Sequence, residues 1–159
     1  MGTRTGSMDP AVMTFLMNKG MTAQEIDDLV NKKSGVAGVS GVSSDFRDLD
    51  NAVLEGNERA KLALDMFIYQ VRKYIGAYAA AMGGIDALVF TAGIGENNGP
   101  MRKDIVSGLE YMGIAIDDEK NLTRGTIDVS ASDARVKTLV IPTDEEMMIA
   151  IDTQRLVEG

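Results

Sequence analysis

The chain has 159 residues, the length of one ordinary domain, and its 45% hydrophobic and 25% charged residues are typical of a soluble globular protein without a membrane-spanning run. Its 16 basic and 24 acidic residues give a net charge of −8, which argues against a nucleic-acid partner because phosphate backbones are neutralised by Lys and Arg. The chain contains no Cys and no His, which excludes disulfides, thiolate nucleophiles, a Ser-His-Asp triad and the usual zinc ligands. Because the sequence shows no apolar leader, we expect a cytoplasmic protein.

Helix signals dominate the first third of the chain. Pro10, near a first helical position, predicts a helix that ends at Gly20. Thr22, with Glu25 three residues later, predicts a capping box at the start of a second helix. The small residues of segment 33–42 predict a loop with room for one helical turn.

The longest periodic segment covers residues 57–82 and follows another helix start at residues 43–48. Its apolar residues recur at three- and four-residue spacings, which predicts a single helix roughly 39 Å long at 1.5 Å per residue. Gly83 and Gly84 directly after it predict its end, because glycine adopts the left-handed conformation that terminates helices.

After residue 84 the hydrophobic period changes from that of a helix to that of a strand. Residues 85–91 form a short apolar run before a glycine-rich turn, and residues 136–141 form a second such run, so both predict buried parallel strands. The other elements that we predict are a helix over 99–112, short strands near 114–116 and 126–129, and a final helix after Asp144. The order of strands and helices predicts an α/β architecture.

A glycine-rich segment lies between the first predicted strand and the next helix. Gly93 and Gly95 allow a ligand to approach the backbone closely, and the helix N-terminus behind them favours anionic groups. Asn98 stands where a Rossmann fingerprint needs its third glycine, and the P-loop motif occurs nowhere in the chain. The alternative is a tight strand-to-helix turn capped by Glu96 or Asn97.

Two carboxylates, Glu96 and Glu145, follow the carboxyl ends of the predicted strands, where open α/β sheets bind ligands. Carboxylates beside a phosphate site commonly hold magnesium, directly or through water. The alternative is that acidic residues in a first helical turn only complement the helix dipole.

Arg4 and the segment Asp45-Phe46-Arg47 are the remaining candidates. Arg4 lies between glycines in a predicted loop, and its permanent, forked charge suits a phosphoryl group in transfer. Asp45, Phe46 and Arg47 offer a carboxylate, a ring and a guanidinium at one helix start, which suits a nucleoside. The alternatives are a solvated surface arginine in the first case, and a helix cap beside an ordinary core phenylalanine in the second.

Taken together, four segments resemble the acetate kinase family, with propionate and butyrate kinases as near relatives. They are MGTRTGSMDP at 1–10, SSDFR at 43–47, FTAGIGEN at 90–97 and IPTDEE at 141–146, in the order in which the family carries them. Each motif alone is weak, but four in order make the resemblance specific, and it extends over essentially the whole chain.

The resemblance implies that residues 1–159 are the C-terminal part of a longer enzyme. The expected fold is a helix-rich, incomplete portion of the second actin-like (ribonuclease H-like) ATPase domain, with a short parallel sheet at its core. The implied reaction is transfer of the γ-phosphoryl group of ATP to acetate with Mg²⁺, by a homodimer. The chain alone is expected to be inactive, because the family's acetate-binding and other catalytic groups belong to the remaining part.

The resemblance also implies roles for the candidate residues. Arg4 matches the arginine that stabilises the transferring phosphoryl group, and Glu145 matches the magnesium-associated glutamate. The implied nucleotide-binding residues are Asp45, Phe46 and Arg47 around the adenosine, and Gly93, Ile94, Gly95, Glu96 and Asn97 beside the nucleotide.

Three alternatives to an acetate kinase stay open at this point. The first is a non-catalytic module for nucleotide binding and dimerisation. The second is another kinase of the actin-like superfamily, which the signature around Arg4 disfavours. The third is a preference for propionate or butyrate, because the acyl pocket is built mostly by the remaining part of the enzyme.

Overall fold

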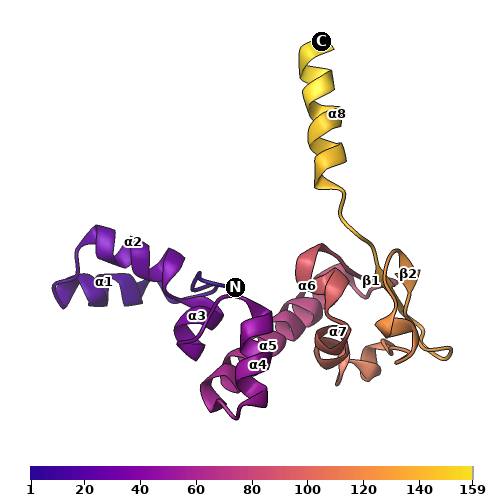
Figure 1. Ribbon diagram of the computed structural model, residues 1–159, viewed down its shortest axis with the longest axis horizontal. Helices are drawn as coiled ribbons and strands as arrows, with labels where there is room; N and C mark the ends of the chain where they lie inside the picture. The colour runs from indigo at the N-terminus through magenta and orange to yellow at the C-terminus, as the bar shows by residue number, and fades with distance from the viewer. Residues whose placement is uncertain (159) are drawn as a thin grey trace. The chain divides into compact units, whose positions relative to one another are not determined.

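The computed structural model describes residues 1–158 (Figure 1). Its backbone contacts divide the chain into two compact units, Met1–Val71 and the part from Arg72 on. The long helix α5, Glu58–Met82, contributes to both units. Within the part of the chain that the structure describes, no helix is both long and apolar enough to cross a membrane.

The first unit is helical. Its elements are α1 (Ala11–Asn18), α2 (Ala23–Lys32), α3 (Gly35–Ser40), α4 (Phe46–Leu54) and the first part of α5. The predicted capping box of α2 is confirmed, because the Thr22 hydroxyl accepts a hydrogen bond from the Glu25 amide at 3.3 Å and the Glu25 carboxylate accepts one from the Thr22 amide at 2.7 Å. Local sequence alone is sufficient to specify this helix start.

Segment 33–42 contains the short helix α3, where we predicted a loop with room for one helical turn. Gly35 explains the difference. Its φ of +61° is strained for any other residue, and a β-carbon on it would lie 2.5 Å from the Met1 carbonyl oxygen. This glycine therefore allows the N-terminal segment to pass close to the start of α3, and it does not break the helix.

Helix α5 agrees with the prediction over 57–82. The Asn57 side-chain oxygen accepts hydrogen bonds from the amides of Arg59 and Ala60, each at 3.0 Å, and so begins the helix. Further along, the Phe67 ring packs edge-on against Phe46 of α4, with 4.7 Å between the ring centres. Phe67 of the apolar stripe predicted on α5 therefore packs against α4 within the first unit.

A small sheet forms the centre of the second unit. Its strands are β1 (Ala87–Phe90), β2 (Ile127–Asp128) and β3 (Lys137–Val140), in the spatial order β1-β3-β2. The predicted parallel pair is confirmed in β1 and β3, whereas β2 runs antiparallel to β3 and makes the sheet mixed.

The prediction that both parallel strands are buried is wrong for β1. One face of the sheet is covered, because Phe90, Thr138 and Val140 are each at most 8% exposed. On the other face Val89 is 46% exposed. An apolar run indicates a strand, but it does not tell whether the same chain covers both faces.

The remaining elements of the second unit are short, except for the last helix. They are α6 (Ala92–Asn97), α7 (Gly99–Val106), the 3₁₀ turns η1 (Glu110–Met112) and η2 (Lys120–Leu122), and α8 (Glu145–Glu158). The helix predicted over 99–112 ends six residues earlier, at Val106, and Gly108 turns the chain with a φ of +88°. The predicted short strands are reduced to β2 and to single bridges at Ile114 and Ile116.

Candidate active site

The carboxyl ends of β1 and β3 lie side by side, because the strands are parallel with Phe90 opposite Val140. The Ile141 amide extends the pairing by donating to the Phe90 carbonyl at 2.9 Å. Helix α6 follows β1, and α8 follows β3 after a four-residue connection (Figure 1). The topology therefore brings the segments of Glu96 and Glu145 to the same end of the sheet, as predicted.

A direct contact links these two segments. The Glu96 carboxylate accepts hydrogen bonds from the Thr143 amide at 2.8 Å and from the Thr143 hydroxyl at 3.0 Å. The Thr143 amide is the main cause that lowers the pKa of Glu96, so this side chain is ionised at neutral pH. Glu96 therefore connects α6 to the residues that lead to Glu145. A further hydrogen bond from the amide of Ala92, the first residue of α6, also lowers its pKa, so the carboxylate contacts the start of its own helix as well.

The predicted glycine-rich turn is mostly helical, because α6 covers residues 92–97. The chain turns into this helix at Ala92, whose φ is +58°. A β-carbon on Gly95 would lie 3.3 Å from the Phe90 carbonyl carbon, so this glycine allows α6 to pack on the end of β1. Gly93 has nothing within 4 Å of the same position, so the space beside its α-carbon is open, and its carbonyl accepts from the Asn97 side chain at 3.0 Å. Asn98 caps the next helix, α7, because its side chain accepts from the Met101 amide at 2.9 Å.

Glu145 is the first residue of α8 and is exposed to solvent. Among residues 1–158 there is no group of three Asp, Glu, His or Cys side chains that could hold a metal ion by itself. Magnesium is nevertheless often bound by one or two carboxylates together with substrate phosphates and water. The single accessible carboxylate of Glu145 fits that kind of site, and it also lies where an acidic residue complements the helix dipole.

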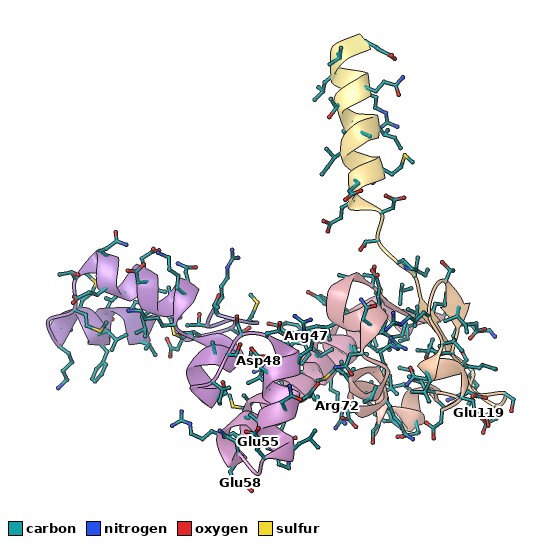
Figure 2. All side chains as sticks on the ribbon, viewed as in Figure 1. Arg47, Asp48, Glu55, Glu58, Arg72 and Glu119 are labelled. Carbon is teal, nitrogen blue, oxygen red and sulfur yellow. The ribbon has the colours of Figure 1, made fainter. Side chains whose placement is uncertain are left out.

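Asp45 begins α4 in the way that the capping alternative predicted. Its carboxylate accepts from the Arg47 amide at 2.9 Å and pairs with the Arg47 guanidinium, with 2.6 Å and 3.1 Å between the bonded atoms. These hydrogen bonds lower the pKa of Asp45 to about 2. Figure 2 labels Arg47 next to Asp48 on the first turn of α4. The Arg47 side chain is 88% exposed, so the pair is available to a ligand.

Arg4 lies on a segment whose backbone is held firmly. Three of its carbonyl oxygens accept hydrogen bonds from the start of α3: Met1 from Val36 (3.0 Å), Gly2 from Ala37 (3.0 Å) and Thr3 from Ser34 (2.8 Å). The Thr5 amide donates to Val30 of α2 at 2.9 Å. The Arg4 side chain is exposed and makes no hydrogen bond or ion pair with any residue from 1 to 158.

Two of the predicted motifs meet in the first unit. A β-carbon on Gly2 would be 3.6 Å from the Ser44 β-carbon, so the segment of Arg4 passes beside the segment of Asp45, Phe46 and Arg47. The other candidates, residues 93–97 and Glu145, belong to the second unit. Each unit therefore gathers its own candidates around one place.

Arg102 of α7 is a residue of this region that our sequence reasoning missed. It is 2% exposed, and its guanidinium donates to the carbonyl oxygens of Gly95 at 2.8 Å and Glu96 at 3.0 Å. A single arginine in a predicted helix carries no pattern that distinguishes it from a solvated residue. Only the tertiary structure reveals that it supports α6.

Comparisons with known proteins agree with these motifs. The sequence matches the model of the Acetokinase family over residues 1–151. Acetate kinase from Heliobacterium modesticaldum is 61% identical over 160 residues, which cover 100% of this chain and 40% of that protein. Acetate kinase from Methanosarcina acetivorans is 60% identical over 160 residues, which cover 99% of this chain and 39% of that protein.

Solved structures give the same result. The structure of Porphyromonas gingivalis acetate kinase superposes with a TM-score of 0.91 at 52% identity, over 99% of this chain and 40% of that one. A propionate kinase from Francisella tularensis gives a TM-score of 0.86 at 38% identity, over 94% of this chain and 38% of that one. The chain thus spans about 40% of the length of its curated relatives, which are phosphotransferases. The actin-like ATPase fold expected from the resemblance is confirmed, and the chain belongs to the acetokinase family.

Proposed function

We propose that this chain is the C-terminal part of an ATP-dependent carboxylate kinase and supplies part of its active site. The reaction is transfer of the γ-phosphoryl group of ATP to acetate. An acetate oxygen forms the new bond to phosphorus, the bond to the β-phosphate oxygen breaks, and acetyl phosphate and ADP are released. The observation that carries the proposal is the meeting of α6 and the segment before Glu145 at the carboxyl ends of β1 and β3, joined through Glu96 and Thr143.

The residue types suit this chemistry. The substrate carboxylate is itself the nucleophile, so phosphoryl transfer needs positioning and electrostatic stabilisation more than a nucleophilic side chain. The exposed guanidinium of Arg4 would meet the charge on the transferring group. Gly93, with open space beside its α-carbon, and the rest of 93–97 would contact the nucleotide, and Asp45, Phe46 and Arg47 would contact its adenosine.

Magnesium would be held by Glu145 together with phosphate oxygens and water. When bound, the ion neutralises the charge of the phosphates and helps to orient them. Within this chain, Thr143 keeps the segment before Glu145 attached to α6 through Glu96, so that the carboxylate and the nucleotide-binding residues remain at the same end of the sheet.

The proposal is tested in a chimeric enzyme, in which the part of the Heliobacterium modesticaldum acetate kinase that this chain does not match precedes this chain. We expect the chimeric enzyme to form acetyl phosphate from ATP and acetate, and the chain alone to form none. A folded chimeric enzyme that binds MgADP without turnover would favour the alternative of a nucleotide-binding module. Turnover by the purified chain alone would contradict the division of catalytic groups.

Propionate or butyrate as the preferred acceptor is a second candidate function. The observation that favours it is the 38% identity to a propionate kinase from Francisella tularensis over 94% of this chain. Comparison of kcat/KM for acetate, propionate and butyrate distinguishes these substrates, provided that the acyl pocket comes from the native protein rather than from the chimera's acetate kinase part.

We further propose that the enzyme is a homodimer and that α5 contributes to its interface. Large apolar side chains are exposed along this helix: Leu62 (52%), Met66 (45%), Tyr78 (63%) and Met82 (66%). Exposed apolar groups on one element are typical of interfaces. Sedimentation of the chimeric enzyme is expected to give a dimer, and a monomer at micromolar concentration would contradict this. A cytoplasmic location and the lack of a nucleic-acid partner stay predictions from the sequence.

The role of Glu145 is tested against its neighbour. Glu145→Ala is expected to raise the magnesium concentration for half-maximal rate by about tenfold or more, because the carboxylate that holds the ion is lost. Glu146→Ala is the matched control, because Glu146 lies in the same first turn of α8 and has the same charge. Kinetic titrations with magnesium measure both variants. Equal, small effects of the two variants would indicate that Glu145 acts only on the helix dipole.

A further inference from the structure

Arg102 is buried without a counter-ion. Only 2% of it is exposed, and its guanidinium forms no ion pair with any residue from 1 to 158. Its acceptors are all neutral oxygens: Gly95 O (2.8 Å), Glu96 O (3.0 Å), Asn121 Oδ1 (2.8 Å) and Asn121 O (2.5 Å). Burial lowers the pKa of Arg102, which reflects the cost of desolvating this charge. Stability alone does not require such a residue, because an apolar side chain of similar volume avoids that cost.

The hydrogen bonds of Arg102 join three elements, α6, α7 and η2. A single nitrogen, Nη1, donates to two successive carbonyls of α6, those of Gly95 and Glu96. On the other side, Asn121 accepts hydrogen bonds from Nε and Nη2 of Arg102. Asn121 in turn donates through Nδ2 to the Gly99 carbonyl at 2.7 Å. The planar fork therefore fastens the end of α6 to the start of α7 and to η2.

Glu96 is held from two directions. Arg102 binds its carbonyl, and Thr143 binds its carboxylate. Between these contacts and the end of β1 lie the residues that we propose to contact the nucleotide, among them Gly93 with open space beside its α-carbon. A displacement of Glu96 would therefore also shift the other residues of segment 93–97, which we propose to contact the nucleotide.

We propose that Arg102 is a positioning residue for the nucleotide, which holds the backbone of α6 in the conformation that the nucleotide meets. It acts through Gly95 and Glu96 and does not itself touch the ligand. The inference rests on the proposed function, because it assigns 93–97 to the nucleotide. It adds a residue outside the four motifs to the nucleotide site.

The test compares Arg102 with a matched arginine in the chimeric enzyme. Arg72 of α5, labelled in Figure 2, also donates to backbone carbonyls, those of Asp104 and Ile105, but not to α6. We expect Arg102→Lys to raise the KM for ATP about tenfold or more, because a point charge cannot hold both carbonyls and small displacements cost large factors. The KM for acetate should stay unchanged. Arg72→Lys should lower the melting temperature at most and leave the KM for ATP unchanged.

A second variant and a second measurement keep the test independent of folding defects and of turnover. Asn121→Ser removes support from Arg102 but leaves its bonds to α6, so an intermediate rise in the KM for ATP is expected. Hydrogen exchange at Asn98, whose amide donates to Ile94 at 3.0 Å, reports the order of α6 directly and should accelerate in Arg102→Lys but not in Arg72→Lys.

Each outcome decides between the hypotheses. Unchanged exchange in α6 would overturn the positioning role, and faster exchange with an unchanged KM for ATP would overturn the connection to the nucleotide. If the unmutated chimeric enzyme transfers no phosphoryl group, the proposed function fails. In that case exchange at Asn98 and the affinity for MgADP, measured by calorimetry, still decide the inference about Arg102.

Discussion

Arg4→Ala in the chimeric enzyme is expected to lower kcat by about 10³-fold or more, with little change in the KM for ATP. The Arg4 guanidinium is exposed and unpaired within residues 1–158, whereas the backbone around it is fixed by four hydrogen bonds to α2 and α3. A charge held in place without a partner is suited to an interaction that forms only as phosphoryl charge develops. Such an interaction affects turnover rather than binding.

Two further variants separate this role from a general loss of positive charge. Arg4→Lys should recover little activity, because a point charge does not reproduce the planar fork. Arg124→Ala is the matched control, because Arg124 is also exposed and unpaired among the described residues and lies in none of the four motifs. Steady-state kinetics and thermal melts measure all three variants. Turnover close to that of the unmutated enzyme in Arg4→Ala would remove the catalytic assignment.

Gly35→Ala is expected to reduce stability by about 3 kcal/mol or more and to lower kcat about 10²-fold in the molecules that fold. The added β-carbon would lie 2.5 Å, 2.8 Å and 2.9 Å from the carbonyl oxygens of Met1, Gly2 and Arg4. Because these acceptors are backbone atoms, the N-terminal segment must move, and Arg4 moves with it. The substitution at Gly35 therefore affects activity indirectly, by displacing Arg4.

The control for Gly35 is another glycine of the first unit. Gly41 has a similar φ of +68°, but a β-carbon there would meet nothing within 4 Å. Gly41→Ala should therefore cost only about 1 kcal/mol, from backbone strain, and leave kcat unchanged. Melting curves and turnover of the two variants give the comparison. Similar results for both would show that strain, and not displacement of the segment of Arg4, explains the effect.

The features that were predictable from sequence are local ones. The capping box of Thr22 and Glu25 and the helix over 57–82 depend on residues close together in the chain, and both are present. The order of four motifs was sufficient to identify the family. The length of α3 was mispredicted, because it depends on how the N-terminal segment packs around Gly35. The early end of α7 was also mispredicted, although Gly108 is a local stop signal.

The same distinction applies to the candidate site. That Glu96 and Glu145 lie at one end of the sheet follows from the rule that parallel strands end together. That Glu96 binds Thr143, and that Arg102 supports α6 from below the surface, depends on side-chain contacts between residues 47 and 6 positions apart, which no spacing in the sequence indicates. Asp45 shows a third case, because it caps α4 and remains available to a ligand, so the two interpretations of its segment are compatible.

The position of β1 has a consequence for biosynthesis. Among the described residues β1 pairs with β3 alone, so its other edge carries free backbone donors and acceptors next to the exposed Val89. Such an edge readily recruits a strand from a neighbouring chain and leads to aggregation. If this chain follows the rest of the enzyme, as we propose, the preceding part leaves the ribosome first and can cover that edge as β1 emerges. The order of synthesis would then protect the nascent protein at the unpaired edge of β1.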